Sequence, residues 1–464
     1  MTDIIWMTAA ELSAAYAAGT LSPVEATRAV LARIDAVDPV LNAFCHRDDA
    51  TVLAQAGESE ARWRAGTVRS PLEGVPVSIK DLMWLKGWPT RYGRLTTSDE
   101  PNPEDDPAVA HLRAAGCVFT GKVTTPEFGN SGVTDSPLTG LTVNPWDTGR
   151  TPGGSSGGSV AAVASGCGPL SLGSDGGGSI RTPASFTNLV GHKPTFGRVP
   201  QAPGEHFGRL SASGPIARTV RDAAMMMNAM AKHALMDWHS LPDDGVDHTA
   251  TLENGVAGLR IAYSADLGFT WCDPEIAEGC RIAIAILRDA GATLEEVDPG
   301  FPVPYSWFGM LWETLSAESA AGMNEETRAG IGREMRDAVE AGKTVSIERF
   351  FHARRMRSDM TRLMDEFHWN WDLIMTPAAA VTAYPTGHDA PPDWPMSEDN
   401  YETFPQPFNA TGQPAVSVPC GFTQAGLPYG LQIAGRRRED ALVLQAARAF
   451  ERANPLFDRR PPLT

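Results

Sequence analysis

Short apolar strands alternate with helices between residues 72 and 175, and this alternation limits the fold more than any other feature of the sequence. In LEGVPVSIKD (72–81), glycine and proline bound a β-branched run at 75–79 that predicts a buried strand with Lys80 at its end. Further along we expect a helix at 111–116, a strand at 117–121, a helix at 159–166 and a strand at 169–175. Such alternation is typical of an α/β protein, in which helices pack on a sheet.

The flanking segments extend this pattern in both directions. The first 65 residues predict helices, because Ser22 and Glu25 form a capping box with Pro23 at the first helical position. The later elements are expected as a helix at 216–233, a strand at 259–264, a helix at 274–291, strands at 372–377 and 415–419, and a helix at 440–453. Aromatic residues are frequent at 301–371, and 378–408 is an irregular loop long enough to indicate a function.

Composition places the chain among folded globular proteins and argues against nucleic-acid binding. With 464 residues, 42% of them apolar, the chain can bury a large core in up to about three domains. Its net charge is −17, and its densest basic run is Arg436–Arg438, whereas nucleic-acid binding requires clustered basic residues. We therefore expect no nucleic-acid partner.

Cysteine usage and the N-terminus predict a cytoplasmic protein with no membrane segment. The six cysteines contain no C-x-x-C pair, which fits reduced thiols, although a bridge between Cys272 and Cys280 remains an alternative. The first residues lack the basic segment of a secretory signal. The longest charge-free run, 151–174, holds seven glycines and six serines, so it is too polar to span a bilayer.

The run GGSSGGS at 153–159 admits several interpretations. A flexible linker would separate domains, yet this run leads directly into a predicted helix and strand. A phosphate-binding loop would need a lysine after the glycines, and none follows. The pattern G-x-S-x-G fits Ser155 and Ser156, so Ser156 could serve a Ser-His-Asp esterase; that elbow requires a preceding strand, which NPWDTGRTP does not resemble.

Three segments taken together resemble the amidase signature family of serine hydrolases. They are GVPVSIKD with Lys80, the run GGSSGG at 153–158, and SDGGGSIRTP at 174–183. Further resemblance lies in GKVTTPEFG (121–129), NPW (144–146), GHKPTFGRV (191–199), ARTVRDAA (217–224), NATGQPAVSVPCGF (409–422) and GLPYGLQ (426–432). The match covers nearly the whole chain and is most specific in the signature core at 72–200.

The resemblance implies a triad of Ser179 as nucleophile, Ser155 as a bridging serine on a cis peptide, and Lys80 as base. The physical chemistry is consistent with these roles. A serine hydroxyl needs a base to become nucleophilic, and a lysine accepts a proton near neutral pH only where burial disfavours its charged form. A position at the end of a core strand provides such burial, unless Lys80 merely pairs with Asp81 or another acid.

The second glycine run supplies the other expected parts of the site. Backbone N–H groups of an oxyanion hole are expected at Gly176, Gly177, Gly178 and Ser179, because side chains there would obstruct the tetrahedral intermediate. Asp175 and Arg181 flank the nucleophile and are expected to support this loop. The family often has threonine, isoleucine or valine at Gly176, so this chain departs from the usual pattern there.

The resemblance implies a single α/β/α domain over 1–464 with a large mixed sheet and a variable, substrate-side segment at 301–408. It implies an amidase that needs no metal or organic cofactor and acts on a small-molecule amide, with aryl esters and carbamates (urethanes) as further substrates of the family. Residues 144–200 also resemble members that cleave nylon cyclic dimers. The alternative is an amidotransferase component that acts only with partner chains, but Thr182 and the 301–400 region differ from that component. The sequence leaves a homodimer open.

Overall fold

A single mixed sheet organises the computed structural model, which describes residues 4–201, 210–396 and 401–463. The described strands are β1 (Phe44–His46), β2 (Pro76–Lys80), β3 (Val118–Val123), β4 (Leu170–Asp175), β5 (Val190–Lys193), β6 (Ala212–Ala217), β7 (Arg260–Tyr263), β8 (Thr293–Glu296), β9 (Leu373–Pro377), β10 (Ala415–Phe422) and β11 (Pro428–Gly435). They form an 11-stranded sheet in the order β1-β3-β2-β4-β6-β5-β10-β11-β9-β7-β8. The sheet is parallel near both ends and antiparallel through its middle, so the predicted α/β class with a large mixed sheet is confirmed.

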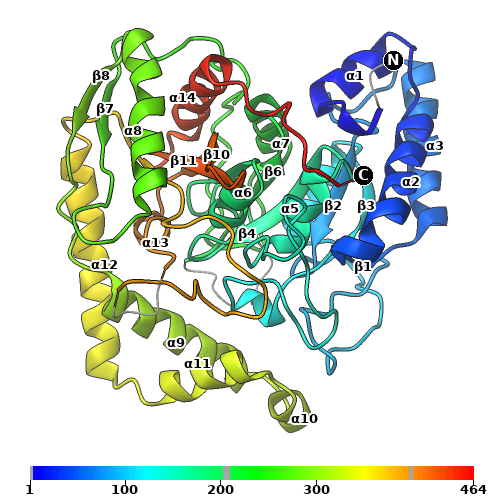
Figure 1. Ribbon diagram of the computed structural model, residues 1–464. Coiled ribbons are helices and arrows are strands. Elements are labelled where there is room, and N and C mark those ends of the chain that lie inside the picture. Colours follow the sequence, from blue (N-terminus) through cyan, green and yellow to red (C-terminus); the bar gives the residue numbers. More distant parts are fainter. Residues whose placement is uncertain (1–3, 202–209, 397–400, 464) are drawn as a thin grey trace.

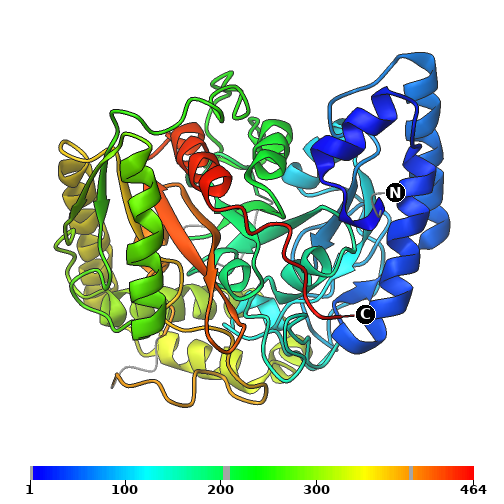
Figure 2. The ribbon, with the colours of Figure 1, turned by 45° about the horizontal axis from the view of Figure 1, so that its top comes forward.

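Helices cover both faces of this sheet (Figures 1 and 2). The described α-helices are α1 (Ala9–Ala17), α2 (Pro23–Leu41), α3 (Asp49–Ala65), α4 (Pro107–Ala114), α5 (Gly157–Ala164), α6 (Arg181–Phe186), α7 (Val220–Met230), α8 (Pro274–Asp289), α9 (Tyr305–Ala321), α10 (Glu325–Ala329), α11 (Arg333–Lys343), α12 (Ile347–Phe367), α13 (Gln406–Ala410) and α14 (Asp440–Ala453). Two 3-10 turns, Ile4–Trp6 and Glu127–Gly129, complete the set. Helices α5 and α6 pack on each other and on the central strands, while α14 packs on α7 and α8.

Two groups of helices lie at the edges of the molecule. Helices α1 to α3 stand beside β1 and β3 at the right of the view, whereas α9, α10 and α11 lie below the sheet at the bottom (Figure 1). We call α9 and α11, which pack on each other, the cover helices. Central strands such as β2 and β4 are buried at every position, because the helices exclude water from both faces.

Local sequence signals explain where the best-predicted elements begin. The Ser22 side chain accepts from the Glu25 amide and the Glu25 carboxylate accepts from the Ser22 amide, so the expected capping box starts α2. The predicted strand at 75–79 is β2, and Lys80 is its last residue. The predicted final helix, 440–453, is α14 with the same limits.

The helix predicted at 216–233 is wrong at its start. Residues 216 and 217 end strand β6, and α7 begins only at Val220, after the Thr219 cap. Strand β6 pairs with β4 and β5, and Gly214 within it lies so close to the His192 carbonyl that a Cβ would collide. Small residues are needed at this approach, so the β-branched signal of a strand is missing from ASGPIA.

The described cysteines are all free thiols, so the alternative bridge between Cys272 and Cys280 is absent. Among residues 4–201, 210–396 and 401–463, no helix combines the length and apolar character needed to cross a bilayer.

Candidate active site

The site is built where two neighbouring parallel strands end. Strands β2 and β4 pair in parallel with Ile79 opposite Leu172, so their carboxyl ends meet at one edge of the sheet. Lys80 ends β2, and Ser174 lies beside the last residue of β4. In open α/β sheets this edge is where binding sites form, because the following loops diverge there.

The Lys80 amino nitrogen lies inside a ring of serine hydroxyls. Its Nζ donates to Ser155 Oγ at 2.6 Å, to Ser156 Oγ at 3.0 Å and to Ser174 Oγ at 3.1 Å. The Lys80 side chain is fully buried. The structure therefore brings Lys80 and Ser155 together, and it adds Ser174, which the sequence analysis did not identify.

The carboxylate next to Lys80 in sequence has a different partner. Asp81 Oδ1 lies 3.1 Å from the ammonium of Lys122, and both side chains are buried. The simple pairing of Lys80 with Asp81 that the sequence left open is therefore not what the structure shows.

The glycine-serine run is part of the packed core. The Gly154–Ser155 peptide bond is cis, as the family resemblance implied. A Cβ at Gly154 would lie 2.7 Å from the Ser131 carbonyl oxygen, and one at Gly158 would collide with the Thr124 backbone. Because the run approaches neighbouring backbone this closely and continues into α5, it is neither a linker nor exposed.

Ser156, the alternative nucleophile, is fully buried. Its hydroxyl accepts from Lys80 and donates to the Ser174 carbonyl at 3.1 Å. Within the described parts of the chain no histidine contacts this hydroxyl through a hydrogen bond. The residues that precede it form no strand, so the geometry of a nucleophile elbow is not present.

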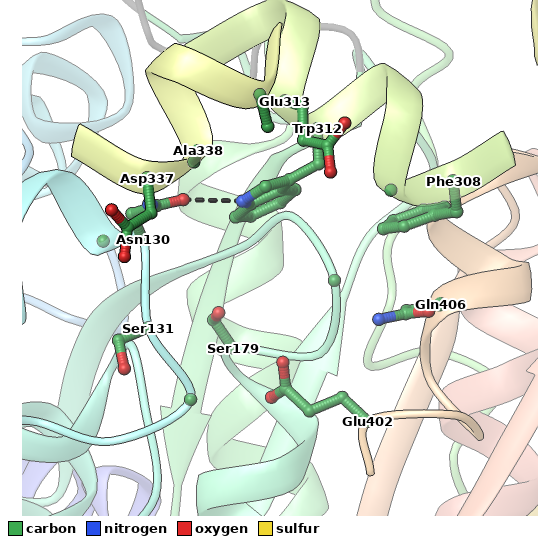
Figure 3. Close-up of a pocket in the computed structure, with 15 residues that line it drawn as sticks. Asn130, Ser131, Ser179, Phe308, Trp312, Glu313, Asp337, Ala338, Glu402 and Gln406 are labelled. Carbon is green, nitrogen blue, oxygen red and sulfur yellow. Dashed lines mark hydrogen bonds between the residues drawn. The ribbon is translucent and has the colours of Figure 1, made fainter. Parts of the chain in front are cut away.

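Ser179 opens onto a cavity of about 460 Å³ (Figure 3). It lies between the second glycine run and α6, and its exposed fraction is 6%, against 2% for Ser155. The Ser156 amide donates to the Ser179 carbonyl at 3.2 Å, which ties the two serine loops together. Of the predicted triad, Ser179 is the member that lines the cavity.

Backbone amides beside Ser179 differ in their availability. The Gly178 N–H donates to Asp175 Oδ1 at 2.9 Å, so it is held by the carboxylate of its own loop. The amides of Gly176, Gly177 and Ser179 have no acceptor among the residues that the structure describes. Of the four amides expected as oxyanion donors, Gly178 is therefore the one that already donates to another acceptor within the described residues.

Asp175 and Arg181 hold the loop as a buried ion pair. Arg181 Nη2 lies 2.8 Å from Asp175 Oδ1, and neither side chain is exposed to solvent. Burial alone would raise the pKa of Asp175, but the Arg181 guanidinium outweighs this and lowers that pKa to about 2. Arg181 also donates to the Pro405 carbonyl at 2.9 Å and to Gln432 Oε1 at 2.7 Å, which fixes α6 against the C-terminal strands.

The cavity lies between Ser179 and the cover helices, which form the opposite wall (Figure 3). Its lining residues are Gly129, Asn130, Ser131, Gly132, Gly177, Ser179, Phe308, Gly309, Trp312, Glu313, Asp337, Ala338, Ala341, Glu402 and Gln406. Trp312 Nε1 donates to Asn130 Oδ1 at 2.6 Å across the cavity (Figure 3). Of the aromatic residues at 301–371, Phe308 and Trp312 line this cavity, whereas Trp307 lies in the core and Trp369 is 74% exposed.

Sequence reasoning missed several residues of this site. Asn130 and Glu402 belong to no motif, and Ser174 opens the segment SDGGGSIRTP but was given no role there; all three reach the site through long-range packing. Burial, with a contribution from the nearby Asp175 carboxylate, raises the pKa of Glu402 to about 8. In the described ranges, no group of three or more histidine, cysteine or acidic side chains is arranged to hold a metal ion.

Comparison with known proteins gives likenesses over almost the full length of the chain. A family model described as Amidase matches residues 25–444. An acylamidase of Rhodococcus erythropolis is 37% identical over 467 residues, which cover 99% of this chain and 98% of the relative. A glutamyl-tRNA(Gln) amidotransferase subunit of Chloroflexus aggregans is 36% identical, over 100% of this chain and 99% of the relative. The crystal structure of a bacterial aryl acylamidase superposes with a TM-score of 0.90 at 30% identity, covering 97% of this chain and 96% of that one.

Proposed function

This chain belongs to the amidase signature family, and from that premise we propose that it hydrolyses the C–N bond of a small-molecule carboxamide through an acyl-enzyme on Ser179. The observation that carries the proposal is the 2.6 Å contact between Lys80 Nζ and Ser155 Oγ, directly behind a cavity that Ser179 lines. Aryl esters and carbamates are included as further substrates, since the same acyl transfer cleaves them.

The first step transfers a proton along the serine relay to Lys80 and forms one C–O bond, while the electron pair of the carbonyl π bond moves to the carbonyl oxygen. Ser179 Oγ attacks the amide carbonyl carbon while its proton passes to Ser155, and the Ser155 proton passes to a neutral Lys80. Full burial of Lys80 favours the neutral form that this step requires. The amides of Gly176, Gly177 and Ser179 stabilise the oxygen of the tetrahedral intermediate, where one such donor contributes about 3 to 4 kcal/mol.

The intermediate then collapses to products. The C–N bond breaks as the proton held by Lys80 returns through Ser155 to the leaving amine, and the acyl group stays on Ser179. Water then attacks the ester carbonyl and gives a proton to the relay; the relay returns that proton to Ser179 Oγ as the bond from the acyl carbon to Ser179 breaks and the carboxylic acid is released. Asp175 and Arg181 keep the loop in place and take no proton.

Labelling with a fluorophosphonate probe tests the nucleophile. Wild-type protein should be labelled on the peptide that carries Ser179, and Ser179→Ala should lose both labelling and turnover. Ser156→Ala is the matched control, since it removes a hydroxyl from the same cluster but should keep the label. A label on Ser156 instead would overturn the assignment and restore the esterase alternative.

Activity of the isolated wild-type chain distinguishes the proposed hydrolase from the amidotransferase-type alternative. The isolated chain should turn over p-nitroanilide, ester or carbamate substrates without added partners. Complete inertness that partner proteins rescue would favour the amidotransferase alternative, which the likeness to the Chloroflexus aggregans relative supports.

A further inference from the structure

The lining of the catalytic cavity carries charge of one sign. Among its fifteen described lining residues, Glu313 and Asp337 supply carboxylates, and none is lysine, arginine or histidine. Glu402 also lines the cavity, but burial raises its pKa to about 8, which leaves it mostly protonated and uncharged at pH 7. The chain as a whole has a net charge of −17, so the surrounding field has the same sign. A substrate that carries a carboxylate would be repelled on entry, whereas one that carries an ammonium group would be attracted.

Aromatic side chains on α9 give the cavity a second feature that suits a cation. Phe308 and Trp312 lie one turn apart with their rings stacked, at 6.4 Å between centroids and 21° between planes. The hydrogen bond from Trp312 to Asn130 holds the indole in place above Ser179 (Figure 3). An ammonium group within about 6 Å of such a ring is attracted by its negative face, most strongly for tryptophan.

We propose that the cavity selects amides that carry a positively charged amine remote from the scissile bond, and that Glu313 and Asp337 make this selection. The inference rests on the proposed function, since Ser179 marks the end where the amide reacts. Glu313 comes from α9 and Asp337 from α11, so both carboxylates belong to the cover helices and lie on the side opposite the floor that holds Ser179.

The electrostatic surroundings of the two carboxylates set the size of the effect. The Asp337 carboxylate lies 4.0 Å from the exposed Arg333 guanidinium, a pair too solvated to cancel its charge. Partial burial raises the pKa of Glu313, with the Arg349 charge acting in the opposite direction. We expect one or two partly screened charge pairs with the substrate, which corresponds to roughly tenfold in affinity.

Binding to the Ser179→Ala variant tests the inference without relying on turnover. Calorimetry would compare three amides of matched shape: 4-(aminomethyl)benzamide, 4-ethylbenzamide and 4-carboxybenzamide. The cationic amide should bind about tenfold more tightly than the neutral one, with the anionic amide weakest. Raising the salt concentration should reduce the difference.

Substitutions on the cover helices test whether Glu313 and Asp337 cause the preference for the cationic amide. Glu313→Gln combined with Asp337→Asn should remove most of the preference, while Glu340→Gln, an exposed change on α11 outside the cavity, should keep it. Equal affinities, tighter binding of the anion, no measurable binding of the cation, or a preference that the double variant retains would each overturn the inference. If wild-type protein still hydrolyses neutral amides in that case, the proposed function stands; if the preference holds but Ser179→Ala retains turnover, the proposed function alone fails.

Discussion

Replacement of Arg181 by methionine removes the cation that neutralises Asp175 inside the protein. The side chains of both residues are fully buried, and Arg181 donates from two nitrogens to the two oxygens of the Asp175 carboxylate, at 2.9 and 2.8 Å. The Asn409 side-chain amide would still donate to this carboxylate, but no positive charge would replace the guanidinium in the ion pair. We therefore expect Arg181→Met to destabilise the fold and to displace the loop that carries Ser179.

The loss of stability expected for Arg181→Met follows from the burial of the Asp175–Arg181 ion pair. Leaving one charge of a buried pair uncompensated costs about 3 to 5 kcal/mol. Independently, a carboxyl whose pKa falls from 3.8 to about 2 on folding stabilises the folded chain by about 2.5 kcal/mol when ionised, at about 1.36 kcal/mol per pKa unit. Because the folded pKa is lowered, this contribution is present above pH 4 and is lost as the pH falls towards 2.

Urea unfolding at pH 7, followed by tryptophan fluorescence, measures the loss in free energy of unfolding. Activity is measured as kcat/KM on an amide that the wild type cleaves. Arg181→Met should lower the free energy of unfolding by at least about 3 kcal/mol. The double variant Asp175→Asn with Arg181→Met should be more stable than Arg181→Met alone, because it removes the unpaired charge at position 175. Arg181→Lys should also lose activity, since an ammonium cannot span the acceptors that the guanidinium fork reaches. A cost below about 1 kcal/mol for Arg181→Met, or a double variant no more stable than the single, would refute the reasoning.

Three further changes probe the site. Lys80→Ala should depress amide cleavage by about 100-fold or more, and near-normal rates in this variant would contradict its role as base. Gly132→Ala should reduce substrate affinity, because a Cβ there would collide with the Tyr401 hydroxyl beside Glu402; unchanged KM would show that the loop adjusts. Burial raises the pKa of Glu402 to about 8, so the folded state holds a proton that the unfolded state releases above about pH 4.5. The contribution of Glu402 to the free energy of unfolding therefore falls as the pH rises from about 4.5 to 8. Glu402→Gln should remove that slope from unfolding midpoints measured across the same range, and an unaltered slope would place the carboxyl in water.

Local sequence signals predicted those parts of the protein that depend on local interactions. The cap at Ser22, the strand that ends at Lys80 and the helix that begins at Asp440 follow from neighbouring residues, and the structure has all three. Strand β6 was not predicted because Gly214 must be small to pack against the His192 carbonyl of β5, and the strand therefore lacks the β-branched residues that signal a strand. The triad residues came from a family resemblance, and the structure brings Lys80 to Ser155.

Partners distant in the chain could not be predicted in the same way. Ser174 meets Lys80 because β2 and β4 are parallel neighbours, a fact of topology. Trp312 meets Asn130 through packing of the cover helices on the loop after β3, and aromatic content alone did not separate it from the exposed Trp369. Such contacts depend on the assembled fold, so no pattern within a short window can reveal them.

The site divides its tasks between separate stretches of the chain. The groups proposed for bond cleavage lie at 80–179 and are fixed from behind by C-terminal residues, since Arg181 is held by the Pro405 carbonyl and by Gln432. The cover helices contribute cavity walls but make none of the hydrogen bonds described for Lys80. Substitutions on α9 and α11 can therefore alter which amide enters while the relay stays assembled, so substrate preference and bond cleavage should be separable by mutation.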